Sequence, residues 1–279
     1  MAFSILFSQV GQVENLQENS LPSPLMAQRY FFEVSYAGTQ YVGSQVQPNG
    51  RTIQGELEKT LNKFLPGEIR ITLSGRTDAG VHGRQWFHLD SEQELSPYET
   101  GHKLNRMLPP DIAIHQVVPV SEEAHARFTA TQRHYAYRVV AQKDPFKREF
   151  ATLFGQSLAV PVMNQAALHL LDWEDFECFS KVKTDVSTFI CNITRAEWVD
   201  SGNGVLTFYV SANRFLRGMV RAIVGTLWEV GLGRCTVEEF RQILESKDRN
   251  RAGRAAPAEG LTLEAVDYPA HIFENREQA

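Results

Sequence analysis

Three features that many proteins use are scarce in this sequence: paired cysteines, long hydrophobic runs and an excess of positive charge. Cys178, Cys191 and Cys235 are odd in number and far apart, so they predict reduced thiols in a cytoplasmic protein rather than a disulfide framework. No apolar run reaches the roughly 18 residues of a membrane span, so no membrane association is expected. Lys and Arg number 28 against 33 Asp and Glu, a net charge of −5, so the overall charge does not indicate nucleic acid.

Residues 1–28 contain no Lys or Arg and are rich in Gln, Asn, Ser and Pro. A secretory signal has a basic start and a longer apolar core, so this segment predicts a flexible tail. No nucleotide-phosphate motif occurs in the chain, and His82 and His88 fit no common ligand spacing. The sequence therefore predicts chemistry carried by side chains, with neither a metal nor a cofactor.

The most informative stretch runs from Ile69 to Asp90. Its first five residues alternate between apolar and polar, the pattern of a half-buried strand. A polar turn follows, in which Gly75 and Gly80 allow tight backbone conformations, and a second apolar stretch completes the unit. Residues 69–90 therefore predict a strand, a loop and a strand.

The loop carries one cation, Arg76, and one carboxylate, Asp78. The simplest interpretation is an Asx-type turn in which Asp78 bonds its own backbone. A plain turn has no need of Arg76 or His82, and catalytic groups often lie on loops that a strand holds in place. Both interpretations remain open on spacing alone.

Apolar periodicity predicts the other elements. Strands are expected over 30–36, 111–118, 133–139, 188–198 and 205–210, and helices over 52–65, 102–108, 164–171, 212–230 and 236–245. The order strand, helix, strand, strand, helix, strand indicates a split α+β unit, and the second half repeats it. We expect two similar domains with largely antiparallel sheets side by side, helices on one face and an active-site cleft between the domains.

Three arginines stand out in the expected helix over 212–230. Arg214, Arg217 and Arg221 are spaced at i, i+3 and i+7, which would align their guanidinium groups along one side of the helix. Cations on a helix this apolar need an anion. Solvent and surface carboxylates are the plain partners, and RNA phosphates with one buried carboxylate are the specific ones.

Four blocks of this sequence resemble the tRNA pseudouridine synthase A family. They are GRTDAGVH over 75–82, the R-x-Y-x-Y pattern over 133–137, NRFLRGMVRAIVG over 213–225 and APAEGLTL over 256–263. The resemblance extends from about Arg29 to Pro269. The chain departs from the family at Ala37, where an acid is common, at Ser44, where an aromatic is common, and at Cys191, where an arginine is common.

The resemblance implies isomerisation of uridine to pseudouridine at positions 38, 39 or 40 of the tRNA anticodon stem-loop, by a homodimer that binds the tRNA across both subunits. Asp78 would be the nucleophile or base, Arg221 its partner favouring the ionised carboxylate, and Tyr135 a stacking and proton-transfer group. The further residues expected to bind the substrate are Arg76, Thr77, Lys103, Arg106, Arg214 and Arg217. Whether Asp78 attacks C1′ or removes the ribose 2′ proton stays open.

The resemblance also suggests a domain division: a tail over 1–28, a domain carrying the Asp78 loop over 29–124, a domain carrying Tyr135 and Arg221 over 125–269, and a tail over 270–279. Because residues 26–38 look like a typical start of the family, Met26 is hypothesised to be the initiator.

Two other functions compete with this interpretation. A non-catalytic RNA-binding protein of the same fold would keep the arginines without needing Asp78. A hydrolase acting through Asp78 would need a second acid or a metal-binding carboxylate cluster, and the sequence shows neither near Asp78.

Overall fold

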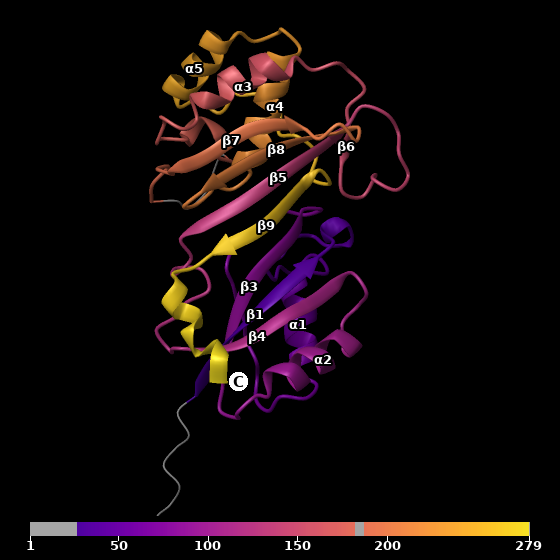
Figure 1. The fold of residues 1–279 in the computed structure, drawn as a ribbon, viewed down its shortest axis with the longest axis vertical. Coiled ribbons are helices and arrows are strands. Elements are labelled where there is room, and N and C mark those ends of the chain that lie inside the picture. Colours follow the sequence, from indigo (N-terminus) through magenta and orange to yellow (C-terminus); the bar gives the residue numbers. More distant parts are fainter. Residues whose placement is uncertain (1–26, 182–186, 279) are drawn as a thin grey trace, which may run out of the picture.

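One sheet of nine strands runs through residues 27–181 and 187–278, which are the residues that the computed structural model describes (Figure 1). The strands are β1 (Gln28–Tyr36), β2 (Thr72–Leu73), β3 (His82–Ser91), β4 (Ile112–Val120), β5 (Gln132–Val140), β6 (Thr152–Leu153), β7 (Ile193–Asp200), β8 (Val205–Ala212) and β9 (Leu261–Asp267). The tail predicted over 1–28 and the hypothesised start at Met26 lie outside the described residues, except that Gln28 already belongs to β1.

The α-helices within the described residues are α1 (Ile53–Leu61), α2 (Pro97–Met107), α3 (Val160–Leu168), α4 (Met219–Gly231) and α5 (Val237–Ser246). Three short 3-10 helices accompany them: η1 (Gly38–Gln40), η2 (Glu177–Phe179) and η3 (Ala270–Gln278). The mixed α and β composition with a largely antiparallel sheet confirms the predicted fold class. None of the described helices is long and apolar enough to cross a membrane.

The strand order repeats along the sheet. In the first half, β4, β1 and β3 lie side by side and β2 pairs with β3, while the second half has the order β9, β5, β8, β7. Each half thus places its first strand between its last strand and the strand that precedes the last one in the sequence. This repeat agrees with the expectation of two similar units, although the division into two domains stays a prediction.

The two halves join where the sheet forks at β3. The start of β3 pairs in parallel with β9, through His82 with Thr262 and Gly83 with Leu263. Farther along β3, the same edge pairs with β2 instead, through His88 with Thr72 and Phe87 with Leu73. The loop from Ser74 to Val81 therefore connects β2 to β3 within the fork between the halves.

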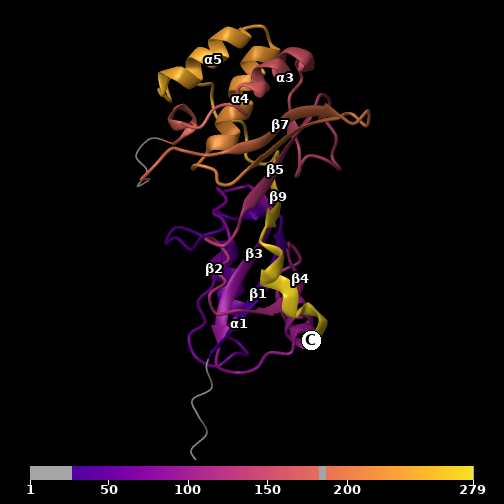
Figure 2. The ribbon, with the colours of Figure 1, turned by 60° about the vertical axis from the view of Figure 1, so that its left-hand side comes forward.

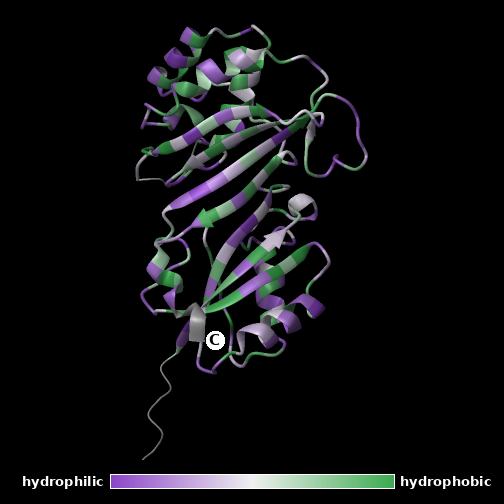
Figure 3. Ribbon diagram, viewed as in Figure 1, coloured by the Kyte–Doolittle hydropathy of each residue, from purple (hydrophilic) through white to green (hydrophobic). Residues whose placement is uncertain are grey.

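Helices cover one face of the sheet, and η3 covers part of the other. Successive side chains of a strand point to opposite faces, and hydrophobic and hydrophilic segments alternate along the strands (Figure 3). Phe32 and Phe87 join the core beneath α1 and α2, whereas Phe31 and Trp86 join a cluster that includes Ile272 of η3. In Figures 1 and 2, η3 lies beside the end of β4. Ile272 and Phe273 of η3 are thus packed in this cluster, and the tail expected over 270–279 stays a prediction.

Two elements differ from their predicted bounds for local reasons. The strand predicted over 69–73 shortens to β2, because α1 side chains take the place of a partner strand: the backbone N–H of Ile69 donates to Asn62 and that of Ile71 donates to Glu58. The helix predicted over 102–108 begins at Pro97, since proline suits the first turn of a helix.

The acid stability of the fold is expected to depend on His88. Burial lowers the pKa of His88 from 6.5 to about 4, and Arg29 and His125 lower it further. The folded state thus keeps His88 neutral while the unfolded chain protonates it below pH 6.5. Stability from this group is complete above pH 6.5 and is lost as the pH falls toward 4. Between pH 7 and pH 4.5 the free energy of unfolding should drop by roughly 2 kcal/mol through His88 alone.

Urea denaturation at both pH values, with the wild type and His88→Gln, measures this contribution. Glutamine keeps an acceptor for the backbone N–H of Ala126, which donates to His88 Nδ1 over 3.1 Å. Between the two pH values, the drop in the free energy of unfolding should be smaller in the variant by roughly 2 kcal/mol. An equal drop in both proteins would contradict the role of His88.

Candidate active site

Asp78 lies at the start of a tight turn just before β3. The backbone N–H of Val81 donates to the carbonyl of Asp78 over 3.1 Å, and Gly80 has a φ of 80°, which glycine adopts without strain. The N–H of Gly80 donates to the carbonyl of Tyr41, so the turn is also tied to the segment after β1. This geometry leaves the Asp78 side chain 33% exposed.

A buried polar network supports the loop from below. The Tyr36 hydroxyl shares a hydrogen bond of 2.9 Å with the hydroxyl of Thr77, and Gln85 Nε2 donates to Tyr36 over 2.8 Å. Gln85 Oε1 in turn accepts from the hydroxyl of Ser74 and from the N–H of Gly75. Burial raises the pKa of Tyr36 to about 12 although these bonds oppose the rise, so its hydroxyl stays neutral.

The segment between β1 and α1 holds the other side of the loop. Ser44 is fully buried and bonds Thr77 twice: its hydroxyl accepts from the Thr77 N–H over 2.8 Å, and its own N–H donates to the Thr77 carbonyl over 3.1 Å. The departure from the family at position 44 therefore has a clear structural use. Gly38 lies so close that a Cβ there would stand 1.9 Å from the Val81 carbonyl oxygen.

Two of the three predicted arginines reach Asp78, but not along one helix side. The helix expected from residue 212 begins at Met219, after Gly218 in the left-handed conformation. Loop hydrogen bonds compete with helix formation here, since Lys181 N–H donates to the Arg217 carbonyl. The predicted helical alignment of Arg214, Arg217 and Arg221 is therefore wrong.

Arg217 Nε nevertheless lies 3.8 Å from Asp78 Oδ1, and an Arg221 terminal nitrogen lies 3.9 Å from Oδ2. Ion pairs this exposed contribute about 0–1 kcal/mol to stability. Fold stability therefore does not account for two guanidinium groups around one carboxylate.

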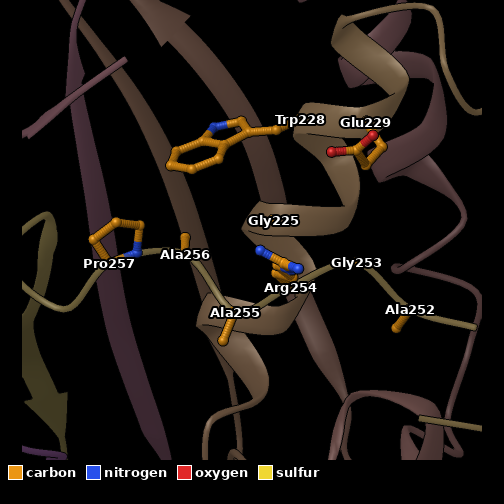
Figure 4. Close-up of a pocket in the computed structure, with 9 residues that line it drawn as sticks. All are labelled: Gly225, Trp228, Glu229, Ala252, Gly253, Arg254, Ala255, Ala256 and Pro257. Atoms are coloured by element: carbon orange, nitrogen blue, oxygen red, sulfur yellow. The ribbon is translucent and has the colours of Figure 1, made fainter. Parts of the chain in front are cut away.

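Arg221 is fixed in place by backbone atoms. Its Nε donates to the Ala256 carbonyl over 2.6 Å, and the Ala256 N–H donates back to the Arg221 carbonyl over 2.9 Å. Figure 4 shows the segment around Ala256 running beside α4, with a pocket of about 480 Å³ whose lining includes Trp228 and Gly225. A Cβ on Gly225 would stand 1.8 Å from the Arg254 carbonyl oxygen, so the close approach requires glycine.

Tyr135 completes the group of predicted catalytic residues. Its ring meets Phe215 edge to face, with 5.1 Å between centroids. Burial raises the pKa of Tyr135, and the nearby Tyr36 and Asp78 raise it further. The carboxylate is thus close enough to act electrostatically on the phenol, which is neutral near pH 7.

The predicted substrate-binding residues fall into three groups. Arg76 and Arg217 are exposed, and Arg76 and Arg214 form no ion pair within residues 27–181 and 187–278. Thr77 is only 7% exposed, and its hydroxyl is engaged with Tyr36. Lys103 and Arg106 lie on α2, where the Lys103 ammonium stands 4.3 Å from the centre of the Phe64 ring. Within the described part of the chain, no ion pair joins Lys103 or Arg106 to Asp78.

Arg133 is a site residue that the sequence reasoning left without a role. Its guanidinium donates to four backbone carbonyls: those of Ser74, Arg127, Ala130 and Asn213. It thereby ties the start of the Asp78 loop to the start of the segment that carries Arg217. The R-x-Y-x-Y pattern was the available signal, but nothing in it indicates carbonyl partners.

The chain is similar to known proteins over most of its length. A family model described as tRNA pseudouridine synthase matches residues 33–129 and 166–269. The tRNA pseudouridine synthase A of Bacteroides thetaiotaomicron is 47% identical over 249 residues, covering 88% of this chain and 93% of that protein. The protein of the same name from Bacillus subtilis is 40% identical over 240 residues, covering 84% and 97%.

The buried network predicts the effect of Tyr36→Phe. Removing the hydroxyl leaves the Gln85 N–H without this acceptor and Thr77 without this partner. An unsatisfied buried polar group costs about 1–3 kcal/mol, so the free energy of unfolding should fall by that amount.

Urea denaturation measures the loss, with Tyr98→Phe as the matched control because Tyr98 is 81% exposed. A Tyr36→Phe protein as stable as the control would show that the network contributes nothing.

Proposed function

The chain belongs to the tRNA pseudouridine synthase family and forms pseudouridine in tRNA, and we propose that it acts at one or more of positions 38, 39 and 40 of the anticodon stem-loop, with Asp78 as the reacting carboxylate. The positions come from the resemblance to the tRNA pseudouridine synthase A family. The observation that carries the assignment of Asp78 is the convergence of Arg217, Arg221 and Tyr135 on this one partly exposed carboxylate.

The reaction detaches uracil from the ribose and reattaches it through a different atom. The bond between N1 and C1′ breaks, the uracil rotates, a bond between C5 and C1′ forms, and the hydrogen on C5 leaves as a proton. One carboxylate is enough to start this sequence, either by attacking C1′ or by taking the ribose 2′ proton. Both routes use the Asp78 carboxylate, whose negative charge lies near the guanidinium groups of Arg217 and Arg221.

The two arginines take different roles in this proposal. Arg221 is held by the Ala256 carbonyl and has a side chain 23% exposed, so it is a fixed counter-charge for Asp78. Arg217 is 60% exposed and has no comparable anchor among the described residues, so it is free to turn toward a phosphate when RNA arrives.

Tyr135 stacks on the uracil in this proposal. A ring held edge to face by Phe215 offers a fixed surface for an extruded base. Since its raised pKa keeps the phenol protonated, its oxygen takes the C5 proton only as its own hydroxyl proton passes to water, so Tyr135 acts as a relay rather than as a standing phenolate base.

The substrate-binding residues follow from charge and exposure. Arg76 is exposed beside Asp78, so we assign it to the space left by the flipped nucleotide or to its phosphate. Arg214 lies three residues before Arg217 in the sequence and would bind a neighbouring phosphate. Thr77 supports the loop from inside, and Lys103 and Arg106 would contact RNA farther from the reacting base.

Release of tritium from tRNA carrying [5-³H]uridine tests the reaction and its carboxylate together. Isomerisation expels the C5 hydrogen, so the wild type should release tritium stoichiometrically with the pseudouridine formed. Asp78→Asn should lower the rate by about a thousandfold or more, because it removes the group that starts the reaction.

The matched control is Asp172→Asn, which changes an exposed carboxylate that has no ion pair among the described residues. Release at the wild-type rate by Asp78→Asn would remove Asp78 from the chemistry. Absence of release by the wild type, with tRNA binding intact, would favour the non-catalytic RNA-binding alternative.

We also propose that the protein is a cytoplasmic homodimer, as the resemblance implies. Exposed apolar side chains on the segment between β5 and β6 support a second copy as the occupant of that surface: Phe146 is 96% exposed and Phe150 is 44% exposed. Apolar groups this exposed often mark an interface between proteins.

Phe146→Asp should convert the dimer to a monomer, because a carboxylate placed in an apolar interface loses its hydration without gaining a partner. Light scattering after size-exclusion chromatography measures the mass. Tyr98→Asp, at another exposed aromatic, should stay dimeric, and a dimeric Phe146→Asp protein would place the interface elsewhere.

A further inference from the structure

Phe128 is an exposed aromatic side chain that the fold does not use. It is 76% exposed, in the turn between β4 and β5. A single exposed apolar side chain is ordinary by itself, so what distinguishes Phe128 is the support beneath its ring and the charge beside it.

The turn around Phe128 is rigid. His125 Nδ1 accepts from the backbone N–H groups of Arg127 and Phe128 over 3.1 and 3.2 Å. The His125 N–H donates to the Thr129 hydroxyl, and the Thr129 N–H donates to the His125 carbonyl, both over 2.9 Å. Exposure of the ring is therefore imposed by a hydrogen-bonded turn and does not result from a loose loop.

A column of rings supports Phe128 from the core. Its ring lies 4.3 Å from that of His125, which lies 4.7 Å from that of His88, and His88 stacks on the fully buried Phe31 at 5.9 Å. Phe128, the outermost ring of the column, is already held in place. The protein therefore loses little side-chain entropy when a flat ligand stacks on this ring. Such preorganisation lowers the entropic cost of binding.

Unpaired positive charge surrounds this ring. The Arg127 guanidinium lies 5.5 Å from the centre of the Phe128 ring. Burial is the main cause that lowers the pKa of Arg133, and Arg127 and Arg214 lower it further, so the three guanidinium groups lie near one another. None of the three forms an ion pair within residues 27–181 and 187–278, so an external anion would relieve their repulsion.

The same arginines connect Phe128 to the active site. Arg133 bonds the carbonyls of both Arg127 and Ser74, the residue that opens the Asp78 loop. It also bonds the carbonyl of Asn213, four residues before Arg217, which contacts Asp78. Hydrogen bonds of Arg133 thus tie the segment that carries Phe128 to the segments that carry Asp78 and Arg217.

We propose that Phe128 is a stacking platform for an unpaired nucleobase of the tRNA substrate, with Arg127 and Arg214 binding the phosphates on either side of that nucleotide. The proposal rests on the tRNA substrate of the proposed function. Aromatic stacking combined with a cationic track is the general means of holding single-stranded nucleic acid. The platform would hold the RNA beside the active site while the target uridine is flipped toward Asp78.

Phe128→Ala tests the platform. Stacking contributes about 1–3 kcal/mol per base, so the Kd for tRNA and the KM should rise about tenfold, while kcat at saturating tRNA stays within about twofold. Phe128→Trp keeps a stacking surface and should bind as the wild type does. Tyr98→Ala is the control, because Tyr98 is exposed to a similar extent and stacks on a histidine, but on α2 at the other face of the sheet.

Abasic substitution along the anticodon stem-loop identifies the stacked base. At one position the loss of the base should weaken wild-type binding about tenfold and should not weaken Phe128→Ala further. Unchanged Kd and KM in Phe128→Ala, or additive losses at every position, would overturn the platform while wild-type tritium release keeps the enzymatic function. A Phe128→Ala protein that becomes monomeric would instead assign the ring to the subunit interface.

Discussion

The distance between the Asp78 carboxylate and the Arg221 guanidinium depends on a short parallel pairing between β3 and β9. Asp78 lies just before β3, and Ala256, whose carbonyl holds Arg221, lies just before β9. Only two residue pairs join the strands, so the junction needs support. His82 supplies it: its Nδ1 accepts from the Gly38 N–H over 3.2 Å, which leaves Nε2 to donate to the Glu259 carbonyl over 3.1 Å. One imidazole thus joins both halves near the place where Asp78 and Arg221 meet.

Elements set by local patterns were predictable from the sequence. The strand predicted over 30–36 and the start of the helix predicted over 52–65 depend on residues a few positions apart, and both were placed closely. The failures have a common cause, which is competition from distant groups. The strand over 69–73 was shortened by bonds from α1, and the helix over 212–230 lost its first turns to loop bonds. The fork at β3 pairs this strand with β9, which is separated from it by most of the chain, so no local sequence pattern predicts the pairing.

The residues of the candidate site also fall into two groups: those that a motif predicts and those whose role depends on distant partners. Asp78 and Arg221 lie in motifs, and the structure brings them within 3.9 Å. The side chains that position Asp78 and Arg221 were not predictable. A buried polar side chain in a strand or a loop looks like any other polar residue in the sequence until its partners are known. Tyr36, Gln85 and Ser44 belong to this class. Arg133 is similar, since its four acceptors are backbone carbonyls, which leave no mark in the sequence.

The ion pairs of Asp78, at 3.8 and 3.9 Å, exceed ordinary hydrogen-bond lengths. The carboxylate is therefore electrostatically paired while its lone pairs remain unengaged by these nitrogens. If a carboxylate had to break a strong bidentate hydrogen bond before reacting, the free energy of breaking that bond would add to the activation barrier. Here the Ala256 carbonyl already holds the Arg221 guanidinium in place, so this charge needs little reorganisation before Asp78 meets the substrate.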